Sequence, residues 1–113
     1  MVLQILKVIA AVGTLLTGLV SLIRPRSVRG FTGLEAPGPR GVTEIRAVLG
    51  GFFIALGVVP LIFGQPSMFL MLGITYLVVA GVRAGSMVVD RSVMKSNLIS
   101  LAVEILFGVI LVL

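Results

Sequence analysis

From Ala47 to Val82 the chain runs for 36 residues without a single Asp, Glu, Lys or Arg. A helix that crosses a bilayer needs about 20 apolar residues, so this stretch is too long for one span. The segment Gly64-Gln65-Pro66-Ser67 interrupts it with residue types that are typical of a turn. The stretch therefore predicts two membrane spans joined by a tight connection.

The composition supports lipid as the solvent of this protein. Apolar residues make up 58% of the chain and charged residues only 12%, whereas soluble domains carry about 25% charged residues. A soluble domain of 113 residues has too small a core to bury that much apolar surface. We therefore expect an all-α integral membrane protein.

The apolar runs predict a single membrane domain, residues 1–113, built as a bundle of four transmembrane helices. The expected spans cover about residues 2–23, 42–63, 67–89 and 94–113. Gly and Pro residues crowd the segment 24–40, which favours a loop over a helix. The connection between the last two spans is short, so we expect these spans to be antiparallel neighbours.

The basic residues predict the orientation. Eight of the nine Lys and Arg residues lie in or beside the two connections on one predicted side of the membrane. The positive-inside rule places that side in the cytoplasm, with both chain termini outside. Lys7 is the exception, and its side chain can snorkel to the outer surface. We expect a multi-pass protein of the bacterial cytoplasmic (inner) membrane, and we attribute the net charge of +5 to these loops rather than to nucleic-acid binding.

The first apolar run is not expected to be a cleaved signal peptide. The basic residues of a signal peptide precede its apolar run, whereas Arg24, Arg26 and Arg29 follow this one. We therefore interpret it as a permanent span.

The residue types present exclude several kinds of active site. The chain has no Cys and no His. Disulfides, zinc fingers, histidine-ligated haem and Ser-His-Asp catalysis all need one of these residues. We expect no catalytic residue, no metal site and no cofactor, and we predict that the protein is not an enzyme.

Four polar residues of the last two spans predict a buried network. Asn97 and Glu104 share one helix face, and Arg83 and Asp90 share another, because each pair is seven residues apart. If the hairpin folds between residues 93 and 94, Arg83 lies level with Glu104, and Asp90 with Asn97. We predict an Arg83–Glu104 ion pair that fixes the helix register. The alternatives are a proton or ion pathway that uses Glu104, and a ligand-binding site.

A second polar group is expected at the cytoplasmic end of the second span. Glu44 in its first turn suits the positive helix end, and Arg46 can snorkel to the surface. The alternatives are a cytoplasmic-side polar site shared with Arg83 and Asp90, and an anionic lipid headgroup site built from Arg24, Arg26 and Arg46.

Small residues mark expected helix contacts. Ala47, Gly51 and Ala55 are spaced four apart in the second span, and Gly81 and Gly85 are spaced four apart in the third. Such spacing lets helix backbones approach closely in membranes. The partner helix can belong to this chain or to another one.

The segment Thr43–Gly51, with the sequence T-E-I-R-A-V-L-G-G, resembles the signature of a domain of unknown function. That family consists of small bacterial four-helix membrane proteins, and its polar positions look similar to Arg83, Asp90 and Glu104. An aromatic residue often precedes the glycine pair in the family, whereas this chain has Leu49 there. The resemblance covers nearly the whole chain and implies the fold, but no activity. A comparison with small multidrug transporters extends to size only, because their essential carboxylate lies in the first span.

Together these features predict a small structural or accessory integral membrane protein that packs with itself or with a larger membrane complex. The alternatives are a small proton- or ion-coupled transporter that uses Glu104, and a binder of lipid, quinone or another apolar ligand. The expected partners are the lipid bilayer and other membrane helices, with anionic lipid as a further candidate and no nucleic acid.

Overall fold

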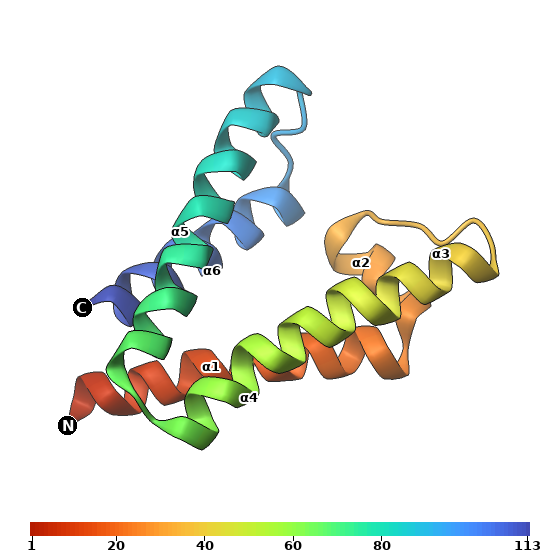
Figure 1. Ribbon diagram of the computed structural model, residues 1–113. Helices are drawn as coiled ribbons and strands as arrows, with labels where there is room; N and C mark the ends of the chain where they lie inside the picture. Colours follow the sequence, from red (N-terminus) through yellow and green to blue (C-terminus); the bar gives the residue numbers. More distant parts are fainter. The chain divides into compact units, whose positions relative to one another are not determined.

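The computed structural model describes all residues, 1–113, and contains helices and turns but no β-strand (Figure 1). Four helical stretches are long and apolar enough to cross a membrane: Val2–Ile23, Pro39–Phe63, Pro66–Val89 and Lys95–Val112. Their mean hydropathy values lie between 1.7 and 2.2. The four predicted spans are therefore confirmed as helices, and each boundary lies within three residues of its predicted position.

The helices follow one another in a simple order. Helix α1 (Val2–Ile23) leads into two short helical turns, η1 (Pro25–Val28) and α2 (Arg29–Thr32). The second long stretch consists of α3 (Pro39–Glu44), η2 (Ile45–Phe52) and α4 (Phe53–Phe63), which follow without a break. The last two stretches are α5 (Pro66–Val89) and α6 (Lys95–Val112).

The chain divides into two compact units. The first unit comprises Met1–Ala10 together with Gln65–Leu113, and the second comprises Ala11–Gly64. Helix α1 thus contributes its first half to one unit and its second half to the other. The prediction of a single membrane domain, residues 1–113, therefore stays a prediction.

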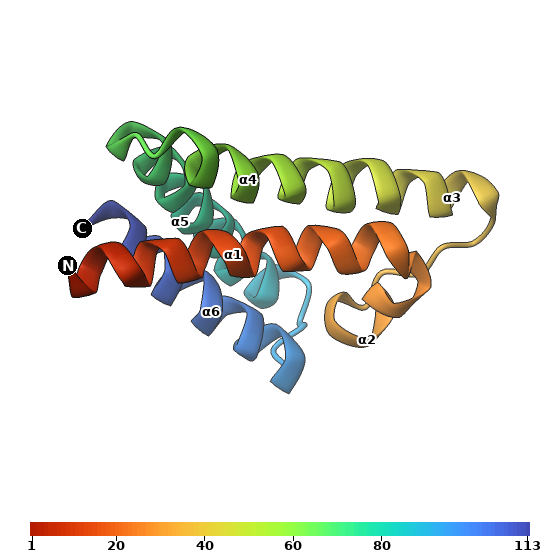
Figure 2. The same cartoon turned by 90° about the horizontal axis from the view of Figure 1, so that it is seen from below.

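In the unit Ala11–Gly64, glycines allow the second half of α1 to pack closely against η2 and α4. The two helices run side by side in both views (Figures 1 and 2). A Cβ atom on Gly57 would lie 2.6 Å from the carbonyl oxygen of Ala11, and one on Gly18 would lie 2.6 Å from the backbone nitrogen of Ile54. Only glycine permits such backbone contact, which is how membrane helices often associate.

The segment 24–40 is more helical than expected. Pro25 occupies the first turn of η1, where its fixed φ suits a helix and its missing N–H is no loss. The hydroxyl groups of Ser27 and Thr32 donate to carbonyl oxygens three and four residues back. Gly33, with φ of 75°, then ends α2 in the left-handed conformation. The prediction of a loop throughout this segment was therefore wrong for Pro25–Thr32.

The second long stretch begins earlier than predicted and changes its winding on the way. Pro39 starts the helix three residues before the expected Val42, again because proline is favoured in a first turn. Between Ile45 and Phe52 the turns widen to hydrogen bonds of the i→i+5 kind. The helix ends at Gly64, whose φ of 67° is left-handed and whose N–H donates to the carbonyl of Pro60.

In the other unit, α5 and α6 form an antiparallel hairpin with an apolar seam. A Cβ atom on Gly73 would lie 2.7 Å from Cβ of Leu111, and one on Gly108 would lie 2.6 Å from a methyl group of Leu77. The rings of Tyr76 and Phe107 meet edge to face, with their centroids 5.6 Å apart. The seam sets the register in which the polar residues of the two helices meet.

The turn between α5 and α6 closes in a Schellman arrangement. The N–H of Ser92 donates to the carbonyl of Met87 at 3.0 Å, which is the bond that defines this helix end. Arg91 holds the left-handed position with φ of 53°, and no other non-glycine residue of the chain has a positive φ. This turn lies next to the polar end of the hairpin.

Candidate functional site

An ion pair between Arg83 and Glu104 joins α5 to α6. The Nε atom of Arg83 donates to both carboxylate oxygens of Glu104, at 2.8 and 3.0 Å, and Nη2 lies 2.6 Å from Oε1. The side chain of Glu104 is 10% exposed and that of Arg83 is 31% exposed. The predicted pairing of these two residues is therefore confirmed, and the fork of the guanidinium holds the carboxylate in a bidentate way.

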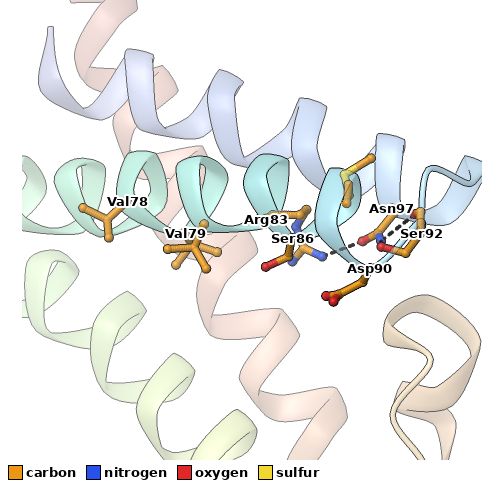
Figure 3. Close-up of a pocket in the computed structure, with 9 residues that line it drawn as sticks. Val78, Val79, Arg83, Ser86, Asp90, Ser92 and Asn97 are labelled. Atoms are coloured by element: carbon orange, nitrogen blue, oxygen red, sulfur yellow. Dashed lines mark hydrogen bonds between the residues drawn. The ribbon is translucent and has the colours of Figure 1, made fainter.

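Asn97 extends this pair to the hairpin turn. Its Oδ1 atom accepts a hydrogen bond from Nη1 of Arg83 at 2.8 Å, and its Nδ2 atom donates to the carbonyl of Ser92 at 3.0 Å. Figure 3 shows both contacts beside the labelled residues. Ser92 was missing from the sequence prediction, although a hydroxyl residue five positions before Asn97 in a short turn is a usable signal. The network therefore links two helices and the turn between them.

The predicted Asp90–Asn97 contact is wrong. Asp90 is exposed, its carboxylate makes no hydrogen bond or ion pair, and Asn97 bonds instead to Arg83 and Ser92. The reason is that α5 ends at Val89, so Asp90 already has the non-helical angles φ −91° and ψ 1°. The expectation that residues at equal distances from the fold point lie level assumes two continuous helices, so it does not hold for a residue that belongs to the turn. The long side chain of Arg83 reaches Asn97 in its place.

A groove of about 440 Å³ lies along α5 beside this network (Figure 3). Three valines and Met87 form its apolar wall, and the polar part of its lining comes from Arg83, Ser86, Asp90, Ser92 and Asn97. Every buried polar side-chain atom of the protein has a hydrogen-bond partner. The network is therefore internally satisfied, and its arrangement is suited to holding α5 and α6 in register.

The second candidate site brings three arginines together. Arg24, Arg26 and Arg46 line one hollow of about 420 Å³, together with Pro25, Ser27 and Val42. Nε of Arg46 donates to the carbonyl oxygen of Leu22 at 3.2 Å. That carbonyl belongs to the last turn of α1, where no helical N–H is available. Sequence reasoning identified the three arginines but missed the anchoring carbonyl, because a backbone atom leaves no sign in a sequence pattern.

Glu44 does not share this hollow. It forms an ion pair with Arg40, one turn earlier on α3, and it is not among the residues that line the hollow with Arg46. The four residues were predicted at one end of the second span, with the headgroup site assigned to Arg24, Arg26 and Arg46 alone, and Glu44 is absent from the lining of that hollow. Residues two apart on a helix point in directions about 200° apart, so one of them must leave the site.

The predicted small-residue faces lie outside the internal helix contacts. Ala47, Gly51 and Ala55 are exposed, and so are Gly81 and Gly85. A Cβ atom built on any of these three glycines meets nothing within 4 Å. The helix contacts inside each unit use a different set of glycines, namely Gly18, Gly50, Gly57, Gly73 and Gly108.

A sequence signal for one internal contact does exist. Gly50 and Gly57 are seven residues apart and therefore share one helix face, and both are buried. The four-residue spacing of Ala47, Gly51 and Ala55 instead marks a neighbouring face that is exposed.

Comparison with protein-family models, with curated proteins and with solved structures found no match. The resemblance of Thr43–Gly51 to a family of small four-helix membrane proteins therefore stays a prediction. No group of three or more carboxylate, His or Cys side chains lies close enough together to hold a metal ion. The geometry of the two sites is thus the basis for the function.

Proposed function

We propose that this protein is a small structural or accessory membrane protein that associates with other membrane helices, either copies of itself or a larger complex. One observation carries the proposal. The chain has two sets of closely spaced small residues, and only one set is used inside its compact units. The other set, on Ala47, Gly51, Ala55, Gly81 and Gly85, remains exposed.

The exposed faces have a physical reason to attract another helix. Lipid tails are as apolar as leucine side chains, so exclusion from water does not drive association inside a bilayer. Helices associate there through close van der Waals packing, which small residues permit. A face of Ala47, Gly51 and Ala55 offers a flat surface about eight residues long, and the flanking Val48 and Phe52 are 45% and 64% exposed.

The Arg83–Glu104 pair supports a structural role over a transport role. A carboxylate that carries a proton or cation must exchange its partner during each cycle. Glu104 instead receives three contacts from one guanidinium, and Asn97 holds that guanidinium from its other side. A buried pair of this kind can fix helix register and orientation without any role in transport.

The proposed location is the cytoplasmic membrane of a bacterium, with both termini outside and the basic connections inside. The distribution of Arg and Lys along the chain supports this orientation, because eight of nine lie in or near the first and third connections, whereas the second connection is uncharged. Reporter fusions at the two termini and in the segment 24–40 test it directly.

Native mass spectrometry of the protein, extracted from its own membrane in mild detergent, tests the association. We expect either a homo-oligomer or a stoichiometric partner protein. Gly51→Leu should reduce the associated fraction, because the larger side chain separates the helices. Gly51→Ala is the matched control and should keep it, since Ala is still small.

The structure makes these two variants informative. A Cβ atom on Gly51 has open space around it, so neither change should disturb the fold of the unit. A protein that stays monomeric and partner-free, with Gly51→Leu and Gly51→Ala indistinguishable from the wild type, would overturn the proposal. Flux measurements on Glu104→Gln would then be the next step.

A further inference from the structure

The hollow lined by Arg24, Arg26 and Arg46 holds the positive charge of the unit Ala11–Gly64 that no carboxylate neutralises. This unit has five arginines and two glutamates, and therefore a net charge of +3. Glu35 pairs with Arg29, and Glu44 pairs with Arg40. The three arginines without a carboxylate partner are the three that line one hollow. We propose that this hollow is a binding site for a phosphate group.

The backbone holds two of these arginines in place. Arg24 and Arg26 flank Pro25, which is buried, and Val28 at the end of the same turn is fully buried. The hydroxyl group of Ser27 donates to the carbonyl oxygen of Arg24 at 2.7 Å. The site is therefore carried by an anchored helical turn, so little backbone freedom is lost when a ligand binds.

Arg46 is held from the other helix. Its Nε atom donates a hydrogen bond to the carbonyl of Leu22 in the last turn of α1, and Arg46 lines the same hollow as the other two arginines. No other hydrogen bond engages this side chain, so both Nη atoms are available. Arg24 and Arg26 use none of their guanidinium donors within the protein. The hollow thus contains unused donors from three guanidinium groups.

Phosphate is the chemistry that fits this donor set. Guanidinium groups present planar pairs of N–H donors that match two oxygens of a phosphate. The hollow has no carboxylate in its lining, so no full negative charge of the protein repels an anion there. The carbonyl end of α1 carries about −0.5 elementary charge, and three guanidinium groups outweigh it.

The surroundings favour a phosphate that belongs to a lipid. The hollow lies directly beyond the last apolar turn of α1, where Leu22 and Ile23 are 41% and 68% exposed. Acyl chains could lie along these residues while the phosphate sits among the arginines. Free phosphate offers the same oxygens without the chains, so the two sources must be separated by experiment. The site does not depend on the helix association proposed above.

The decisive experiment compares two double variants with equal charge. Arg24→Gln with Arg26→Gln removes two arginines of the hollow, whereas Arg29→Gln with Arg40→Gln removes two arginines that are paired with glutamates. Both variants lower the charge of the same segment by two, so their effects on membrane orientation are matched. Detergent-purified protein is titrated with phosphatidylglycerol, with phosphatidylcholine and with inorganic phosphate, and the bound species are counted by native mass spectrometry.

We expect phosphatidylglycerol to bind the wild type more tightly than phosphatidylcholine. The double variant of the hollow, Arg24→Gln with Arg26→Gln, should bind phosphatidylglycerol about 30-fold more weakly than the wild type, which corresponds to about 1 kcal/mol for each arginine. The paired-arginine variant should lose less than about threefold. Arg46→Lys, which keeps the charge but loses the planar donors, should bind more weakly than the wild type as well.

The other possible outcomes either identify the source of the phosphate or overturn the proposal. In one outcome, millimolar inorganic phosphate displaces phosphatidylglycerol from the wild type but does not bind to the double variant Arg24→Gln with Arg26→Gln. That result would support the phosphate site and assign it to a free phosphate. Equal weakening in both double variants would reduce the effect to general charge attraction and overturn the proposal. Failure of the wild type to bind any of the three probes would overturn it too.

Discussion

Nη2 of Arg83 lies 2.6 Å from Oε1 of Glu104, across the interface between α5 and α6. The two residues are 21 positions apart in sequence, and each lies within a helix apolar enough to cross a membrane. A charged side chain in such a helix costs several kcal/mol of insertion free energy when it has no partner. The pairing therefore explains how two ionisable residues are tolerated within this hairpin.

Breaking the pair should destabilise the hairpin. Glu104→Gln keeps the shape but leaves the charge of Arg83 without a counter-ion. Removing one partner of a buried pair costs about 3–5 kcal/mol, and the 31% exposure of Arg83 reduces this to about 2–3 kcal/mol. Unfolding in mixed detergent micelles measures the change.

Two further variants separate charge pairing from general damage. The double variant Arg83→Met with Glu104→Leu removes both charges and should recover most of the lost stability, because no unpaired ion remains. Glu44→Gln alters an exposed pair and should change stability little. Equal losses for the single and the double variant would mean that the ion pair is not the reason.

Asn97 should matter less than Glu104 but more than Asp90. Asn97→Ala removes the amide oxygen that accepts from Arg83 and the amide nitrogen that donates to the carbonyl of Ser92. We expect the free energy of unfolding to fall by about 1–2 kcal/mol. Asp90→Asn should have no measurable effect, since the Asp90 carboxylate bonds to nothing. The same unfolding measurement orders the variants, and a larger loss for Asp90→Asn than for Asn97→Ala would contradict the observed network.

The internal glycines should be intolerant of even one methyl group. Gly57→Ala places a Cβ 2.6 Å from backbone atoms of Ala11 and Leu15, which cannot move independently of α1. We expect a loss of about 1–3 kcal/mol, as for other overpacked contacts. Gly51→Ala is the control in the same helix and should fold normally, because its Cβ has open space. Thermal unfolding in detergent compares the pair.

The turn after α5 should be stabilised by glycine. Arg91 holds φ of 53°, a conformation that costs an L-residue roughly 1 kcal/mol or more and costs glycine almost nothing. We therefore expect Arg91→Gly to raise the free energy of unfolding by about 1 kcal/mol. Arg91→Ala removes the same charge but keeps the Cβ, so it should not give this gain. A gain of equal size in both variants would point to charge instead.

Much of the architecture could be predicted from local pattern alone. The uncharged run from Ala47 to Val82 and its central Gly-Gln-Pro-Ser segment located two helices to within three residues and their connection to within one. The heptad spacing of Arg83 with Asp90, and of Asn97 with Glu104, together with a short turn, was enough to pair Arg83 with Glu104. The same reasoning gave a wrong contact for Asp90, because helical spacing does not predict the residue at which a helix ends.

What the sequence by itself determined about this protein is the set of four apolar helices and the Arg83–Glu104 pair, since both follow from hydrophobic length and helical periodicity. The tertiary structure alone decided which glycines lie in helix contacts, that Glu44 turns away to Arg40, and that three arginines meet around the carbonyl end of α1. Those outcomes depend on the rotation of each helix about its axis and on backbone atoms, and periodicity within a single helix does not specify either.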